Sequence, residues 1–373
     1  MTFGTTSPIL GRCARVVSLK AHLASLVFLL AVAASAQSTP SQSTPQPPSS
    51  PSTAPSTPSQ LDKPLTREEI DNLELKLAAH EDWTKLSIKD LGLEPYPPLV
   101  DPGTVDRPTF TRKIVRLQWR SSDPVDVYIS LPKDVKKPRV VLYLYGYPGD
   151  ASRLTSDDWC AGAIKGGFAA VGFVSALTGE RYHAPRPMKS WFVSELQESL
   201  ATSTHDVQMI LNYLETRGDL NLDRVAMYAQ GSGATIAILA ASVDPRIQVL
   251  DLLNPWGDWP DWLKQSGWVP DNERPDYLRP EFLEKVASFD PVRVLSKLTT
   301  PIVRLQQVKD DRLMPEVARE KIAAALPRGA ASLLSDSWPE YMKAFKEQNL
   351  WGWAKEKLAA QPDSTPARSS GGS

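Results

Sequence analysis

The amino-acid sequence predicts an α/β fold with a doubly wound, mostly parallel sheet that helices cover on both faces. Apolar segments of strand length alternate with helical segments from residue 139 to residue 358. The first of these segments, "RVVLYLYGYPGD", is apolar almost throughout and ends in Gly and Pro, as buried parallel strands do. About 300 residues, Leu61 to Ala360, remain for this fold, which suits one large domain.

The two ends of the chain have compositions that exclude them from the domain. Residues 1–36 are typical of a signal peptide, with a basic start, an apolar run over 23–34 and small residues at 34–36. The run is too short to span a bilayer, although a retained membrane anchor is the alternative. Residues 37–60 contain only Gln, Ser, Thr, Pro and Ala, and with residues 361–373 they are expected to be disordered. We therefore expect an exported protein, periplasmic or secreted, with no membrane span in the mature chain.

Charge and cysteine content exclude several classes of function. The net charge is −1 and no basic stretch is dense enough for nucleic acid. Cys13 leaves with the signal peptide, so Cys160 has no intrachain partner and is expected to be a buried structural residue. Neither a metal nor a cofactor is expected, because the histidines never pair at ligand spacing. They are His22, His80, His183 and His205. The oligomeric state stays open.

The elements before residue 139 have clear local signals. Thr66 and Glu69 form a capping box, and apolar residues on one face predict a helix from Thr66 to about Trp83. Two alternating strands, 110–122 and 125–132, are separated by a turn at Asp123 and Pro124 and predict an antiparallel hairpin.

From residue 139 onward, strand and helix signals alternate, with one interruption. An insertion between 254 and 301 contains Trp256, Trp259, Trp262 and Trp268. Further strands are predicted at 168–174, 224–229, 249–254, 301–307 and 331–334. Helices are predicted at 156–165, 203–215, from 232, at 315–326, and in a last segment ending near 358.

The stretch "YAQGSGATIAIL", residues 228–239, has the pattern of a nucleophile elbow, the strained strand-to-helix turn that presents a catalytic residue. Small residues are needed two positions before and two after that residue. An apex at Gly231 puts Ala229 and Gly233 there, whereas an apex at Ser232 puts the long side chain of Gln230 there. The first register is favoured, and it places glycine where the nucleophile would be.

With this turn in view, residues 139 to about 326 resemble the α/β-hydrolase superfamily, in the branch of dienelactone hydrolases, acetyl xylan esterases and prolyl-oligopeptidase-like peptidases. The matching segments are "VVLYLYGYPGD", "HDVQMILNYLETRGDLNLDRVAMYAQGSGATIAILAASVDPRIQVL" and "PIVRLQQVKDDRLMP". The resemblance implies an oxyanion loop at Gly146 and Tyr147, with the N–H of Ser232 as second donor. It also implies an acid at Asp311, with Asp310 as the neighbouring alternative.

The resemblance further implies a catalytic histidine after the last strand, but residues 335–345 contain none, and no histidine follows His205. His205 is expected to be a surface or capping residue, and His183 lies in a loop on the ligand side of the sheet. Arg181 and Arg186 either hold a carboxylate or phosphate or pair with surface acids. Trp256, Trp259 and Trp262 either cap a pocket as a lid or anchor that lid against the sheet.

Three hypotheses about function follow. The first is an exported α/β-hydrolase-fold protein without serine-hydrolase activity, whose pocket binds a small molecule or a partner. The second is a serine esterase or peptidase that uses Ser232 with His183 or His205 as base. The third is acid-base chemistry without a nucleophile, carried by Asp311 and His183. The first is preferred because a serine hydroxyl needs a base within hydrogen-bond reach to attack at neutral pH.

Overall fold

A computed structural model gives the structure of the chain, and all the residues it describes belong to one unit, Thr57–Ser373. The predicted signal peptide, linker and tail lie outside the described residues, as does most of the predicted helix from Thr66, although Glu68 is helical and Trp83 lies in a turn. The described residues are 66, 68, 82–93, 100–118, 123–147, 149, 151–177, 181 and 192–360.

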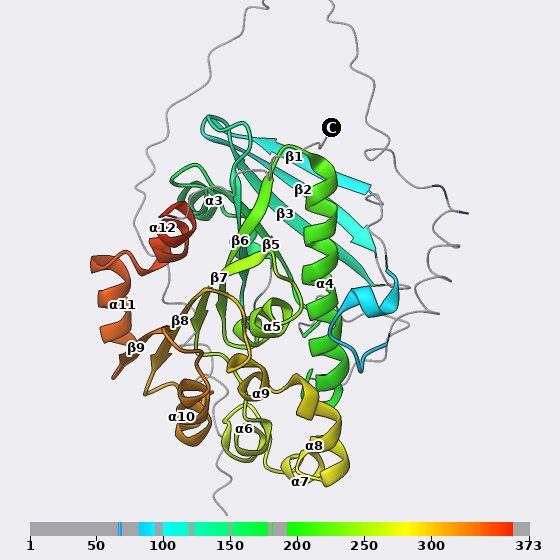
Figure 1. Ribbon diagram of the computed structural model, residues 1–373, viewed down its shortest axis with the longest axis vertical. Coiled ribbons are helices and arrows are strands. Elements are labelled where there is room, and N and C mark those ends of the chain that lie inside the picture. The colour runs from blue at the N-terminus through cyan, green and yellow to red at the C-terminus, as the bar shows by residue number, and fades with distance from the viewer. Residues whose placement is uncertain are drawn as a thin grey trace, which may run out of the picture. The chain divides into compact units, whose positions relative to one another are not determined.

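The core of the fold is a nine-stranded sheet in the order β1-β2-β3-β5-β4-β6-β7-β8-β9. Neighbours are parallel from β5 to β9 and antiparallel from β1 to β5, so the predicted mostly parallel sheet is confirmed (Figure 1). The strands are β1 (Val100–Asp106), β2 (Phe110–Gln118), β3 (Pro124–Pro132), β4 (Arg139–Leu144), β5 (Ala169–Phe173), β6 (Asn221–Gln230), β7 (Ile247–Leu253), β8 (Ile302–Val308) and β9 (Ala331–Ser335).

The antiparallel end of the sheet contains the predicted hairpin, β2 with β3, and one strand that the sequence does not predict. That strand is β1, which pairs with β2. It contains Pro102 and Gly103, two residues that are depleted in strands, and its register shifts between Val100 and Gly103. Pro is tolerated there because β1 is an edge strand.

The helices follow the predicted alternation, with two differences. Helix α4 begins at Leu196 rather than Ser203, and the last segment is broken at Asn349, whose φ is 48°. The described helices are η2 (Ile88–Leu91), α2 (Ser152–Thr155), α3 (Asp157–Ala163), η4 (Phe192–Glu195), α4 (Leu196–Arg217), α5 (Ser232–Ala241), α6 (Trp259–Gln265), α7 (Arg274–Tyr277), α8 (Pro280–Val286), η5 (Ala287–Phe289), α9 (Pro291–Leu295), α10 (Glu316–Ala324), α11 (Trp338–Glu347), η6 (Leu350–Gly352) and α12 (Trp353–Ala360).

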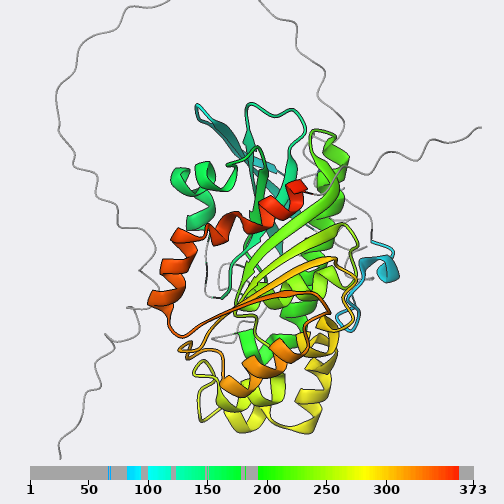
Figure 2. The same ribbon diagram turned by 60° about the vertical axis from the view of Figure 1, so that its left-hand side comes forward.

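Strand β4 shows why both faces of the sheet are buried. Its alternate side chains enter two different clusters. Val140, Leu142 and Leu144 belong to the cluster that contains α4 and α5, whereas Val141 and Tyr143 belong to the cluster beneath α3 and α12. Figures 1 and 2 show α4 and α12 on opposite faces of the sheet. The fold is therefore doubly wound, as predicted.

The Trp-rich insertion follows β7, at the carboxyl end of the parallel strands. It contains α6, α7, α8 and α9, which lie together at one end of the sheet (Figure 1). In a doubly wound sheet this is the end where ligands bind. Among the described helices, none combines the length and the apolar character that crossing a membrane requires.

Candidate active site

The turn between β6 and α5 has its apex at Gly231. This residue has φ 53° and ψ −126°, in a region that residues with a side chain enter only under strain. Its N–H donates to the carbonyl of Leu253 at 2.8 Å, which holds the turn against the end of β7. Glycine adopts this conformation without a steric penalty.

Close backbone contacts around the apex explain the small residues on both sides of it. A Cβ on Gly233 would lie 2.5 Å from the carbonyl oxygen of Leu144, and one on Gly146 would lie 2.9 Å from that of Gln230. Ala229 is fully buried. Only small residues fit, so the turn has the register that the sequence pattern predicts.

Ser232, the first residue of α5, turns its hydroxyl toward the loop after β4. Its side chain is 1% exposed, and its Oγ accepts the backbone N–H of Tyr147 at 2.8 Å. That N–H belongs to the loop from which the resemblance expects one oxyanion donor. The hydroxyl of Ser232 therefore binds the backbone N–H of the oxyanion loop, and Ser232 is not the residue at the apex.

An indole lies against the apex on the side where a nucleophilic side chain would begin. A Cβ on Gly231 would meet Nε1 of Trp256 at 3.5 Å and Cε2 at 3.6 Å. Trp256 is 2% exposed, and its carbonyl accepts the hydroxyl of Thr235 at 2.6 Å. Its ring stacks on Trp262 with centroids 5.1 Å apart, and Trp268 lies at 6.5 Å from it. Trp256 thus lies within contact distance of the apex, and Trp262 and Trp268 pack against it.

Asp311 lies in the loop after β8 and is held by two hydrogen bonds. Its carboxylate accepts the N–H of Leu313 at 2.9 Å and Nδ2 of Asn254 at 2.6 Å. Burial raises the pKa of Asp311, and these two donors oppose the rise. Asn254 follows β7 and has φ 44°. Asn254 is not among the site residues predicted from the sequence. Its only sequence signal is its position directly after a buried strand.

The segment where the resemblance expects a catalytic histidine caps a helix instead. Ser337 accepts the N–H of Glu340 and begins α11, and the N–H of Trp338 donates to Asp310 at 3.1 Å. Asp310 therefore binds this segment, while Asp311 faces β7.

His205 is the one histidine within the described residues, and the expectation of a surface or capping position is wrong. It is 2% exposed and lies in the middle of α4, which begins at Leu196. Its Nε2 is 2.8 Å from the carbonyl oxygen of Lys85. His183 and Arg186 lie outside the described residues.

Arg181 lies in the interior and is 4% exposed. Its Nε and Nη2 donate to the carboxylate of Asp123 at 2.9 and 3.1 Å, and its Nη1 donates to Asp206 at 3.1 Å and to the carbonyl of Val174. Two buried carboxylates thus contact its guanidinium, which ties the start of β3 to α4. The acids it meets are buried ones, not the surface acids that the loop setting suggested.

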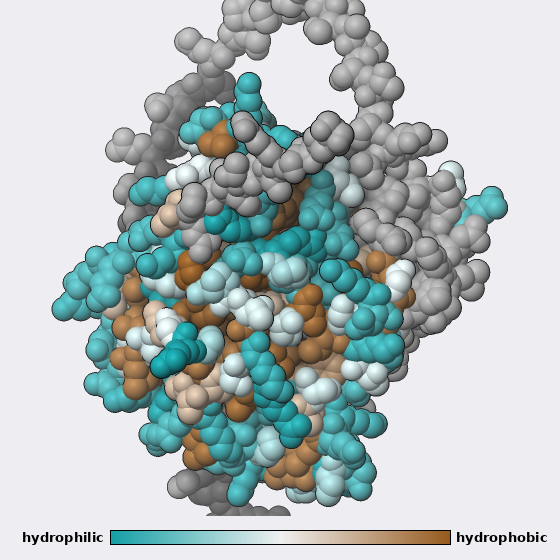
Figure 3. Space-filling model, in the orientation of Figure 1, coloured by the Kyte–Doolittle hydropathy of each residue, from teal (hydrophilic) through white to brown (hydrophobic). Residues whose placement is uncertain are grey.

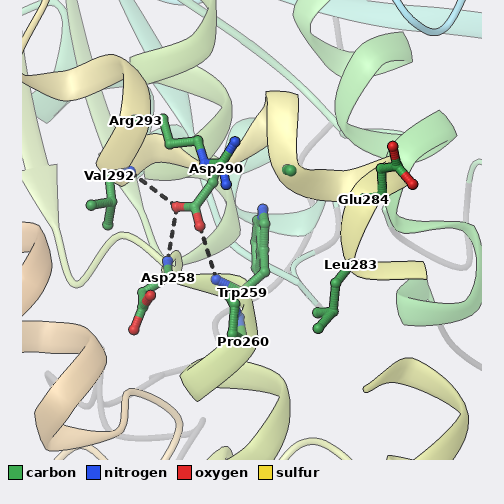
Figure 4. Close-up of a pocket in the computed structure, with 9 residues that line it drawn as sticks. Asp258, Trp259, Pro260, Leu283, Glu284, Asp290, Val292 and Arg293 are labelled. Carbon is green, nitrogen blue, oxygen red and sulfur yellow. Dashed lines mark hydrogen bonds between the residues drawn. The ribbon is translucent and has the colours of Figure 1, made fainter. Parts of the chain in front are cut away.

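A groove of about 400 Å3 lies in the insertion, between α6, α8 and α9 (Figure 4). Trp259, Leu283 and Val292 give it an apolar lining, with Glu284 and Arg293 at its margin. The carboxylate of Asp290 accepts three backbone N–H groups there, from residues 258, 259 and 292, so it is already satisfied. Of the three tryptophans predicted for a pocket, Trp259 lines this groove, and Trp256 and Trp262 are packed inside the fold.

Comparison with known proteins supports the fold. No protein-family model and no curated protein matches the chain by sequence. Among solved structures, an acetyl xylan esterase from Paenibacillus sp. is 16% identical with a TM-score of 0.55, over 78% of this chain and 97% of the esterase. Acetyl xylan esterase 1 from Thermoanaerobacterium sp. is 11% identical with a TM-score of 0.59, over 79% and 99%.

A peptidase is also similar in structure. Acylaminoacyl peptidase from Pyrococcus horikoshii is 12% identical with a TM-score of 0.51, over 69% of this chain. The chain spans only 43% of that peptidase. At these identities the likeness concerns the fold.

Proposed function

The chain has the α/β-hydrolase fold, and we propose that it keeps this fold without the serine-hydrolase reaction. The observation that carries the proposal is the 2.8 Å hydrogen bond from the Tyr147 N–H to Ser232 Oγ, next to a glycine apex. A hydroxyl becomes a nucleophile when a base lies within hydrogen-bond reach, and in the described residues this hydroxyl meets a backbone amide. The Tyr147 N–H, which lies in the expected oxyanion loop, is occupied by the same hydrogen bond.

In place of hydrolysis, we propose that the protein binds a small molecule at the carboxyl end of its sheet. Two features support this role. The Trp-rich insertion forms an aromatic layer over the elbow, and a groove of about 400 Å3 with a largely apolar lining lies in the same insertion. This volume is within the range of small-molecule sites, which are mostly apolar.

A fluorophosphonate probe tests the loss of serine chemistry. We expect no covalent labelling of the folded protein beyond the level of heat-denatured protein and of the Ser232→Ala variant. Hydrolysis of p-nitrophenyl acetate should likewise equal that of the Ser232→Ala variant. Stoichiometric labelling of Ser232 in the folded protein would contradict the proposal and would establish the esterase or peptidase alternative.

Acid-base chemistry by Asp311 is the second candidate, and the raised pKa of this carboxyl favours it. Burial keeps the proton on Asp311 to higher pH than on an exposed aspartate, which suits a general acid. His183 is its proposed partner. To test this candidate, the turnover of hydration, elimination and isomerisation substrates is measured for the parent protein and for Asp311→Asn. Turnover that is equal in the two proteins removes Asp311 from catalysis.

We also propose that the protein is exported, because residues 1–36 have the charge and apolar pattern of a signal peptide. Mass spectrometry of the protein from a host with a secretory pathway should give a chain that begins at Gln37. A chain that retains its first residues and stays in the cytoplasm would contradict export. That result would leave the proposal on Ser232 unaffected.

A further inference from the structure

The sheet ends at a strand whose outer edge has no partner strand among the described residues. Strand β9 is the last of the nine and pairs only with β8. The sequence of β9, "ASLLS", contains neither charge nor proline, the two devices that most often protect an edge strand from further pairing. The open edge is therefore chemically able to accept another strand.

Exposed apolar side chains lie on β9 and on the helices that precede and follow it in the chain. The described residues expose four large hydrophobic side chains, and three of them lie on β9 or on its two neighbouring helices. Val317 on α10 is 40% exposed, Leu334 on β9 is 49% exposed and Trp338 on α11 is 38% exposed. Figure 3 shows apolar residues among polar ones over the region where Figure 1 places these elements. A surface of this kind marks an interaction site more often than an inert face.

We propose that this edge, defined by β9 with Val317 and Trp338, binds a second copy of the chain in antiparallel orientation. The register of β9 supports this occupant. The carbonyl of Ser335 accepts the N–H of Lys309, so Ser335 points its backbone groups toward β8. Because these groups alternate along a strand, those of Ser332 and Leu334 point outward. If Leu333 lies on a twofold axis, Ser332 of one copy faces Leu334 of the other. The backbone N–H and C=O groups of these two residues then form two hydrogen bonds with each other.

Charge at the two ends of β9 also matches a second copy. Arg328 precedes the strand, is exposed and has no ion-pair partner among the described residues, whereas Asp336 follows the strand. Its side chain is 75% exposed and already forms an ion pair with Lys309. With Leu333 on the twofold axis, Asp336 faces the partner's residue 330, and the partner's Arg328 lies two positions away, a diagonal distance that a long side chain spans. Parallel pairing would bring like charges together.

The area needed by a stable dimer sets a requirement on the neighbouring helices. Specific interfaces bury at least about 1,200 Å2 in total, which is more than a five-residue strand provides. Helices α10 and α11 must therefore contribute, through exposed side chains such as Val317 and Trp338.

Sedimentation velocity of the purified full-length protein at micromolar concentrations tests the proposal. The expected result is a mass twice that of the chain. Leu334→Lys places a charge in the interface, and Ser332→Pro removes an outward N–H, so each should raise the dimer dissociation constant at least about tenfold. The matched control is Trp83→Lys, which removes an exposed tryptophan outside this edge and should leave the dimer intact.

A charge exchange then distinguishes this geometry from other dimers. Arg328→Asp and Asp336→Arg should each weaken the dimer, and the double variant should recover most of the loss. Circular dichroism establishes that each variant is folded. A protein that stays monomeric, a dimer that Leu334→Lys and Ser332→Pro leave unchanged, or a different protein paired at β9 would each overturn the proposal.

Discussion

Oγ of Ser232 and the backbone nitrogen of Tyr147 lie 2.8 Å apart, and their hydrogen bond joins the start of α5 to the loop after β4. The side chain of Ser232 is almost fully buried. The serine thus has a structural task at the place where hydrolases carry out chemistry.

Ser232→Ala is expected to destabilise the protein. The substitution leaves the Tyr147 N–H without its acceptor in a buried setting, which costs about 1 to 3 kcal/mol. Urea unfolding measures the loss. The control is Ser242→Ala after the other end of α5, where the hydroxyl donates to a carbonyl in a less buried position. A Ser232→Ala variant as stable as the parent would contradict a structural role.

Gly231→Ser restores a hydroxyl at the apex and is expected to give no hydrolase activity. Ordinary contact distances to Trp256 leave room for the Cβ, but the one histidine among the described residues, His205, has its Nε2 on the carbonyl oxygen of Lys85 instead. The positive φ should cost the folded state about 1 kcal/mol or more. Thermal unfolding and p-nitrophenyl acetate hydrolysis are the measurements, and an esterase rate above that of Ser232→Ala would refute this expectation.

Arg181→Met is expected to lose about 3 to 5 kcal/mol of unfolding free energy, because Asp123 and Asp206 then stay buried without the guanidinium that contacts both of them. Arg116→Met is the matched control. Arg116 makes a similar two-point contact to Asp126, at 2.7 and 2.8 Å, but is 42% exposed. Its loss should therefore cost less than about 1 kcal/mol. Similar losses in the two variants would show that burial does not set the strength of the Arg181 pair.

The pH dependence of stability should report on Lys355. Burial lowers the pKa of this lysine to about 8, from 10.5 when unperturbed, while its Nζ donates to the carbonyls of Gly162 and Ala163. Above pH 8 the folded protein releases this proton while the unfolded chain keeps it until about 10.5, so stability rises with pH over that window. The rise is at most about 3 kcal/mol.

Lys355→Met should remove this rise and stabilise the protein at pH 7. Lys357→Met, which changes an exposed lysine on the same helix, should keep the rise. Urea unfolding from pH 7 to pH 10.5 measures both variants. A parent protein whose stability falls over this window would contradict the sign of the effect.

The sheet and the elbow could be predicted from the sequence because each has a local signal. A run of apolar residues identifies a buried strand, and the steric demand for small residues at 229 and 233 locates the apex at Gly231. The same local reasoning missed β1, since Pro102 and Gly103 hide a strand that its pairing with β2 stabilises.

The contacts of the polar side chains could not be predicted, because they depend on residues distant in the chain. Arg181 meets Asp123 and Asp206 only after β2, β3 and α4 have packed together. His205 was expected at the surface because the helix start was placed seven residues too late. The Ser232–Tyr147 bond spans 85 positions and has no sequence signature.

The position of Trp256 against the glycine apex has an optical consequence. A molecule that enters the space above Gly231 must displace or touch this indole, whose ring stacks on Trp262. Intrinsic fluorescence therefore gives a signal for ligand screening, and because the chain has eleven tryptophans, an emission shift that is lost in Trp256→Phe marks a compound at the elbow. The protein can be screened without a label and without any assumption about a reaction.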